Sequence, residues 1–202
     1  MVVRQHRPVD SANARPAAVL HWPASFDKAQ DLLIVAVDTP DTPIRDTARQ
    51  LVRTVLREIL GDVELVSEPG QPIRLAGQDS PIGISVSHEN ALSLLAINFA
   101  GPVGIDLLRI PDRPDWPAQI PGLALDYLGP KIAQRIARLL HEEQMAQFAQ
   151  AWTEHEARLK CRCLALEEWS ATQEEKLSPC RTQQLSLPAG YVGAIATRLA
   201  KY

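Results

Sequence analysis

The feature that most constrains the fold is a continuous apolar run from Leu32 to Val37, bounded by Asp31 and Asp38. An uninterrupted run of this length is typical of a strand that is buried on both faces. Apolar residues at helical spacing follow between Thr42-Pro43, a typical helix start, and Gly61, a typical helix stop. The sequence therefore predicts a buried strand followed by a helix with one buried face.

Two further apolar segments, 82–87 and 91–99, are separated by only His88, Glu89 and Asn90. So short a connection predicts an antiparallel hairpin with these three residues in its turn. The segment 103–110 is a predicted strand interrupted by one carboxylate, Asp106.

The rest of the chain repeats this order of elements. We expect 111–121, which contains four prolines, to be an irregular loop. Helical spacing resumes at Pro130 and continues to Leu159, and strands are predicted over 183–187 and 191–199. Each half thus contains a strand, then helix, then a hairpin, which predicts an α+β fold.

We expect three regions: a flexible polar tail over 1–18, an N-terminal half over 19–101 and a C-terminal half over 102–202. No residue-level repeat supports the two halves, so the duplication is inferred from element order alone.

Composition excludes several classes of protein. The chain has 202 residues, of which 46% are hydrophobic, enough for a real core. Its net charge of −3 provides no general basic field, so we expect no nucleic-acid partner. No apolar segment approaches the roughly 18 residues needed to cross a bilayer, so we expect no membrane association. Three cysteines, an odd number, favour a reducing, cytoplasmic setting.

Three places carry residues suited to chemistry: Ser87-His88, Asp106, and Glu156 with Lys160. Each has a simpler explanation when taken alone. Ser87 and His88 are acceptable polar turn residues, Asp106 can bond backbone donors at a strand end, and Glu156 and Lys160 have the i, i+4 spacing of a surface ion pair. Cys161 and Cys163 lack a second pair at metal-ligand spacing, so packing at a helix end is their expected role.

The combination of these places is more specific. Ser87-His88, then Val103-Gly-Ile-Asp106, then Trp152-Thr-x-x-Glu-Ala-x-x-Lys160 together resemble the motifs of the surfactin-type 4′-phosphopantetheinyl transferases. Leu51-Val-Arg-Thr-Val55 is similar to part of the family's first helix, and Gly70-Gln-Pro72 is similar to its Gly-Lys-Pro. The resemblance covers roughly residues 30 to 170.

The resemblance implies a fold of two pseudo-symmetric α/β halves packed around a central cleft that holds coenzyme A. It implies transfer of the 4′-phosphopantetheine arm of coenzyme A to a serine of an apo acyl or peptidyl carrier protein, with Mg²⁺. The implied catalytic residues are Asp106, Glu156 and Lys160, and Asp106 and Glu156 are the implied metal ligands. The implied coenzyme A contacts are Arg53, Thr54, Ser87, His88 and His155. Because both halves lie in one chain, we expect a monomer.

The chain also departs from the family pattern. The residue two after Asp106 is Leu108 rather than a third metal carboxylate, His155 stands where the motif has lysine, and Gln71 replaces the lysine of Gly-Lys-Pro. Ser85 and Glu89 replace the asparagine and serine that flank Ser-His. The alternative is therefore a degenerate relative that binds coenzyme A or a carrier protein with little or no transfer.

Overall fold

The structure, a computed structural model, describes residues 16–23, 30–40, 45–66, 73–76, 81–110 and 116–198. Helices and antiparallel strands are mixed along this part of the chain, so the expected α+β class is confirmed.

The N-terminal sheet contains four strands in the order β1-β2-β6-β5. The strands are β1 (Leu20–His21), β2 (Leu32–Asp38), β5 (Gly83–Glu89) and β6 (Leu92–Asn98). β2, β6 and β5 pair antiparallel, and β1 pairs parallel with β2. A separate short ribbon joins β3 (Leu65–Val66) to β4 (Arg74–Leu75).

Helix α1 (Arg45–Leu60) covers one face of this sheet because its apolar residues fall on one stripe. The stripe packs on alternate residues of the strands, and together they form a buried core: Val52, Val55, Leu56, Ile59, Leu33, Val35, Val37, Ile84, Leu95 and Ile97. The predicted buried strand and helix are therefore confirmed, with the helix start before residue 45 lying outside the described residues.

The C-terminal sheet contains β7 (Val103–Arg109), β8 (Cys180–Gln184) and β9 (Tyr191–Arg198) in the order β7-β9-β8, all antiparallel. The long helix α4 (His141–Arg162) lies along this sheet, and α5 (Ala171–Leu177) follows it. The helices α2 (Trp116–Leu123) and α3 (Pro130–Ala137), joined by the π-helical segment η2 (Ala124–Leu128), pack against the first half of α4.

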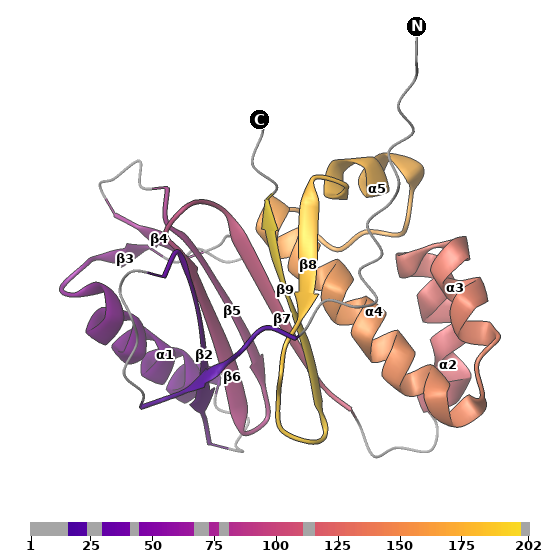
Figure 1. The fold of residues 1–202 in the computed structure, drawn as a ribbon, viewed down its shortest axis with the longest axis horizontal. Helices are drawn as coiled ribbons and strands as arrows, with labels where there is room; N and C mark the ends of the chain where they lie inside the picture. Colours follow the sequence, from indigo (N-terminus) through magenta and orange to yellow (C-terminus); the bar gives the residue numbers. More distant parts are fainter. Residues whose placement is uncertain are drawn as a thin grey trace, which may run out of the picture.

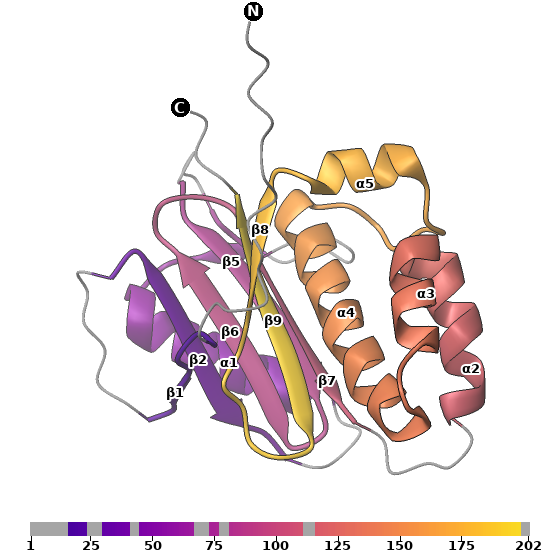
Figure 2. The same cartoon turned by 45° about the vertical axis from the view of Figure 1, so that its right-hand side comes forward.

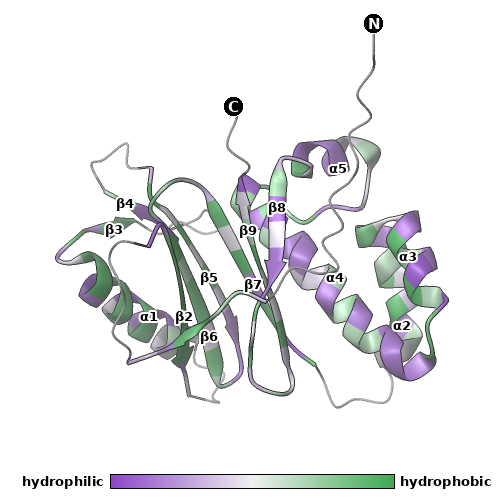
Figure 3. Ribbon diagram, viewed as in Figure 1, coloured by the Kyte–Doolittle hydropathy of each residue, from purple (hydrophilic) through white to green (hydrophobic). Residues whose placement is uncertain are grey.

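The two sheets lie between the two main helices, so the layers run α1, N-terminal sheet, C-terminal sheet, α4 (Figures 1 and 2). A second apolar core joins the sheets: Ile34, Ala36, Leu92, Leu94, Ala96, Val103, Ile105, Leu107, Leu185 and Ile195. β2 and β6 are accordingly among the most hydrophobic segments in Figure 3, whereas α5 is largely hydrophilic.

Two glycines allow β7 to approach its neighbours closely. A Cβ on Gly104 would lie 1.9 Å from the carbonyl oxygen of Ala157 in α4. A Cβ on Gly83 in β5 would lie 2.3 Å from the carbonyl oxygen of Gly101, just before β7. Because neither distance is possible for a real side chain, only glycine lets α4 and β5 pack this closely on the β7 segment.

The three-stranded units share one strand order. Both units, β2-β6-β5 and β7-β9-β8, have the strand that comes last in the sequence at their centre. That strand pairs with the other two, and every pairing is antiparallel. In both units helix separates the first strand from the other two.

The N-terminal segment connects these units. Residues 1–15 of the expected tail lie outside the described residues, but Ala17 already forms a parallel bridge with Leu185. Its amide N–H donates to the carbonyl of Gln184 at 2.7 Å. Ala17, which belongs to the expected tail 1–18, is thus paired with the C-terminal half.

Three local predictions were wrong. His88 and Glu89 belong to β5, and the hairpin turns at Asn90 and Ala91, where Ala91 has φ 65°. The predicted loop 111–121 contains the start of α2, because Ile120, Ala124 and Leu128 recur four residues apart and pack against α4. β8 begins three residues earlier than predicted, because this partly exposed strand carries no apolar pattern.

Candidate functional site

Asp106 is a buried carboxylate in the middle of β7, with 7% of its surface exposed. Alternate residues of a strand face opposite ways, so Val103, Ile105 and Leu107 enter the core between the sheets while Asp106 faces α4. It therefore does not mark a strand end, and its charge needs partners from neighbouring elements.

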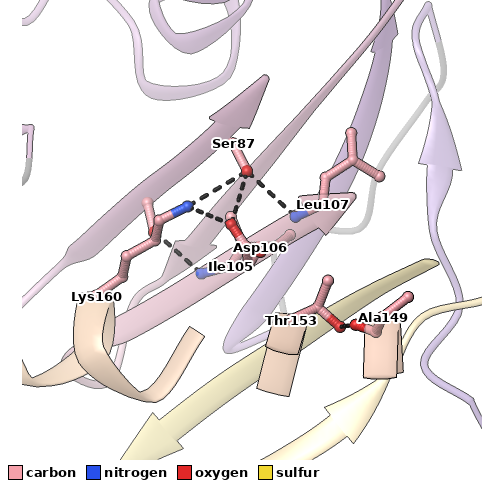
Figure 4. A network of polar contacts seen from close by, with 8 residues as sticks. Ser87, Ile105, Asp106, Leu107, Ala149, Thr153 and Lys160 are labelled. Carbon is pink, nitrogen blue, oxygen red and sulfur yellow. Dashed lines mark hydrogen bonds and ion pairs between the residues drawn. The ribbon is translucent and has the colours of Figure 1, made fainter. Parts of the chain in front are cut away.

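Those partners are Lys160 of α4 and Ser87 of β5 (Figure 4). The Lys160 ammonium donates to Oδ1 of Asp106 at 2.6 Å, and the Ser87 hydroxyl donates to the same oxygen at 3.0 Å. Lys160 also lies 3.3 Å from Ser87 Oγ. The three predicted residues Ser87, Asp106 and Lys160 thus lie in contact. The partner of Lys160 is the buried Asp106, so Lys160 is more than one member of a surface ion pair within α4.

Ser87 also belongs to a row of side chains that cap one edge of β7. The amide of Leu107 donates to Ser87 Oγ at 3.2 Å, and the amide of Ile105 donates to Ser85 Oγ at 3.0 Å. The Glu89 carboxylate accepts from the amide of Arg109. Buried amides need acceptors, and here side chains two residues apart on β5 supply them where no backbone ladder forms.

The Asp106 charge acts on two other carboxylates of this region, those of Glu156 and Glu89. Burial raises the pKa of Asp106, with Lys160 and Ser87 opposing the shift. Burial also raises the pKa of Glu156, and the Asp106 charge raises it further. The pKa of Glu89 is raised by burial and, to a smaller extent, by Asp106. Glu156 and Glu89 therefore both lie close enough to Asp106 for its charge to raise their pKa values.

The donor chemistry of this site suits a hard divalent cation, since carboxylate oxygens are the ligands that Mg²⁺ prefers. Asp106 and Glu156 supply two carboxylates whose mutual repulsion a cation would relieve. In the described part of the chain, no group of three or more His, Cys, Asp or Glu side chains has a metal-site arrangement. Any Mg²⁺ here would need water or ligand oxygens to complete its coordination.

His88 lies on the opposite face of β5 from Ser87, as strand alternation requires. Its Nδ1 is 2.7 Å from the hydroxyl of Ser93, a β6 residue that lies opposite it in the pairing. His88 is thus on the α1 side of the sheet, and Asp106 is on the other side.

Arg53 and Thr54 are in the middle of α1, so they share that side of the sheet with His88. The Thr54 hydroxyl donates to the carbonyl of Gln50 within the helix at 3.1 Å. An open pocket of about 340 Å³ is lined by Thr54, Arg57, Glu58, Gly61 and Asp62, and includes neither Arg53 nor His88.

His155 is in different surroundings from its neighbour Glu156. It is 1% exposed, its Nε2 has no hydrogen-bond partner within the described structure, and burial lowers its pKa to about 4. The charges that act on it are those of Arg158 and Glu174, which form an ion pair at 2.9 Å. The structure therefore does not bring His155 to the Asp106 network.

Ser85 and Glu89 are the residues of this region whose roles sequence reasoning missed. Both were seen only as departures from a motif. Their period-two spacing with Ser87 is the signal that places all three on one face of β5.

None of the helices in the described ranges combines the length and apolar content needed to span a bilayer. A comparison with models of known protein families finds no match, and a search of curated proteins finds no similar protein.

Proposed function

We propose that this protein transfers the 4′-phosphopantetheine arm of coenzyme A to a serine of an apo acyl or peptidyl carrier protein. The observation that carries the proposal is the ion pair between Lys160 and Asp106, with Glu156 beside it. These residues come from two motifs about fifty residues apart, which the sequence linked only by resemblance. Ser87, from the separate Ser87-His88 motif, contacts both members of the pair.

The shared strand order of the two sheets supports the finer fold proposal. Two pseudo-symmetric halves, 19–101 and 102–202, would each supply a strand, helix and hairpin around a central cleft. β7 and β5 then meet where the halves join, and the Asp106 network lies at that junction. A monomer suffices for this arrangement because one chain provides both sides.

The chemistry required is mainly positioning and charge. Attack of a serine hydroxyl on the pyrophosphate of coenzyme A releases adenosine 3′,5′-bisphosphate and builds negative charge on phosphate oxygens. Mg²⁺ held by Asp106 and Glu156 would act as a Lewis acid toward those oxygens. The Lys160 ammonium would contact the same phosphates.

Glu156 is the proposed general base. Burial, the largest cause of its raised pKa, makes its carboxylate a stronger base than an exposed glutamate. It would accept the proton of the attacking serine, directly or through one water.

The pyrophosphate and the 3′-phosphate of coenzyme A are attached to the same ribose, so only a short span of the ligand separates them. β5 is the last strand of the N-terminal sheet as described, but its edge lies against β7 from Ser85 to Glu89, so the ribose would have to pass the end of the strand beyond Glu89. The pyrophosphate would lie near Asp106, and the 3′-phosphate near His88, Arg53 and Thr54. Ser87 would contribute by holding Asp106, and His155 by packing within α4. A cytoplasmic location, where coenzyme A and carrier proteins are found, agrees with this proposal.

The test is transfer to a panel of apo acyl and peptidyl carrier proteins with coenzyme A and Mg²⁺, measured by intact mass. We expect the mass of one phosphopantetheine on at least one carrier, and no addition when the acceptor serine is alanine. Arg53→Ala should lose affinity for coenzyme A but not for 3′-dephospho-coenzyme A. Absence of transfer to every carrier would contradict the enzyme proposal.

A second candidate is a binding protein that retains coenzyme A or a carrier protein without transfer. The Lys160 contact with Asp106 favours it, because that ammonium already neutralises one proposed metal ligand. Leu108 favours it as well, because it supplies no third carboxylate. Coenzyme A binding in calorimetry, combined with failure to modify every carrier, would select this candidate.

A further inference from the structure

All three cysteines of the chain gather where α4 ends. Cys161 is in the last turn of α4, Cys163 follows that helix in a left-handed conformation with φ 54°, and Cys180 opens β8. Cys180 packs against a small buried cluster made of Ala157, Cys161, Ala194 and Ala196. The structure thus brings Cys161 and Cys180 into contact although they are nineteen positions apart in the sequence.

The two thiols of this pair differ in exposure. Cys161 is 3% exposed, and its Sγ is 3.7 Å from the carbonyl oxygen of Pro102. Cys180 is partly exposed, and a hydrogen bond joins it to the Cys161 thiol. A small reagent can therefore reach the Cys180 thiol from solvent, whereas the Cys161 thiol is buried.

Positive charge surrounds Cys180. Arg198 is its direct partner in the pairing of β8 with β9, and Arg158 and Arg162 approach from α4. The Cys161 hydrogen bond and these guanidinium groups lower the pKa of Cys180 to about 7. The same hydrogen bond and burial raise the pKa of Cys161. Cys180 is therefore the nucleophilic thiol of the pair, since the thiolate is the reactive form.

We propose that Cys180 and Cys161 form a dithiol site that a hydroperoxide oxidises to a disulfide. The Cys180 thiolate attacks one peroxide oxygen, the O–O bond breaks, and the leaving hydroxide takes up a proton to form water. This leaves a sulfenic acid on Cys180. Cys161 then loses its thiol proton and attacks the Cys180 sulfur, the S–O bond breaks, and a second water leaves.

For hydrogen peroxide the balance is one peroxide and two thiols consumed, and one disulfide and two waters formed. The new bond would tie the last turn of α4 to the first residue of β8. We expect Cys163, although more exposed, to stay reduced, because the hydrogen-bonded pair is Cys161 with Cys180.

The order of residues makes the disulfide easy to map. Trypsin cleaves after Lys160, Arg162, Lys176 and Arg181, so each cysteine falls in a different peptide: 161–162, 163–176 and 177–181. Reduced protein is treated with one equivalent of hydrogen peroxide, remaining thiols are alkylated, and the digest is analysed by mass spectrometry. We expect peptide 161–162 linked to 177–181, and peptide 163–176 alkylated.

Matched variants test each role. Cys161→Ser should leave a sulfenic acid on Cys180 that dimedone traps, Cys180→Ser should abolish the reaction, and Cys163→Ser should react as the wild type does. Arg198→Gln should slow the reaction severalfold at pH 7, whereas Arg181→Gln, which lies on the other face of β8, should not.

The wild-type digest needs no variant to fold, so it decides the proposal by itself. A link between 163–176 and 177–181, a disulfide between two molecules, or oxidation of Cys163 before Cys180 would overturn it.

Discussion

The Lys160 ammonium lies 2.6 Å from Oδ1 of Asp106, joining the last turns of α4 to the middle of β7. The carboxylate side chain is 10% exposed and the lysine side chain 31%. An ion pair in such surroundings offsets the cost of burying Asp106, and loss of one member leaves the other poorly compensated. The pair therefore has a structural role whatever reaction it supports.

Lys160→Met tests this role, because methionine keeps much of the apolar stem and removes the charge. We expect a loss of about 2 kcal/mol in the free energy of unfolding at pH 7.5, since Asp106 loses its charged donor and keeps neutral ones, the Ser87 hydroxyl and the Leu107 amide. The pKa of Asp106 should rise further, so the loss should shrink at low pH, where the carboxyl is protonated. Urea unfolding at several pH values measures both effects.

Lys131→Met is the matched control, because Lys131 is exposed on α3. It should leave the free energy of unfolding nearly unchanged. Equal losses in the two variants would mean that the Asp106 pair contributes nothing specific.

Ser87→Ala and Ser85→Ala separate two roles of the serine row. Each variant leaves one buried β7 amide without its acceptor, so both should lose about 1 to 3 kcal/mol in the free energy of unfolding. Only Ser87→Ala also removes a hydrogen bond to the Asp106 carboxylate, so only it should raise the Asp106 pKa. NMR titration of Asp106 distinguishes the two, and an equal pKa in both variants would contradict a positioning role for Ser87.

Sequence reasoning succeeded where the signal is local. The apolar run of β2, the stripe on α1 and the i, i+4 spacing of Glu156 and Lys160 each follow from neighbours within a few residues. Strand alternation likewise predicts which residues share a face of a strand, so Leu108 could be placed on the same face as Asp106 once a strand was predicted there.

Sequence reasoning failed where a structure depends on contacts between residues far apart in the sequence, or where the local signal is weak. The contact between Lys160 and Asp106 spans 54 residues, and no periodicity predicts it. Ser85 and Glu89 could not be interpreted without knowing that the edge of β7 lies against β5. The short helix α5 was not anticipated, although Ser170 caps it by accepting from the amide of Gln173.

Glu156→Gln should stabilise the protein while abolishing transfer. The folded pKa of Glu156 is raised, so ionisation of Glu156 disfavours the folded state. The free energy of unfolding of the wild type should therefore fall relative to that of the variant as the pH rises. The fall begins above the pKa of Glu156 in the unfolded chain and is complete above its pKa in the folded protein. We expect a higher Tm for Glu156→Gln at pH 7.5 and nearly equal values near pH 3.5.

Glu154→Gln, two residues away on α4, is the control for this comparison. No Tm gain in Glu156→Gln at pH 7.5, or a gain that persists at acid pH, would show that ionisation of the buried Glu156 does not destabilise the fold. Retained transfer would remove Glu156 from the proposed base role.

Leu108→Glu tests whether the metal site lacks only one ligand. Leu108 and Asp106 are two residues apart in β7 and face the same way, and Leu108 is partly exposed. A glutamate there would add a third carboxylate beside Asp106 and Glu156, and a hard cation gains from each further charged oxygen ligand. Leu108→Glu should therefore bind Mg²⁺ more tightly than the wild type in calorimetry without coenzyme A, and should reach half-maximal transfer at lower Mg²⁺. Leu108→Gln has the same shape without the charge and should bind Mg²⁺ as the wild type does. Equal Mg²⁺ affinity in the folded Glu and Gln variants would mean that Asp106 and Glu156 do not hold a metal at this face of β7.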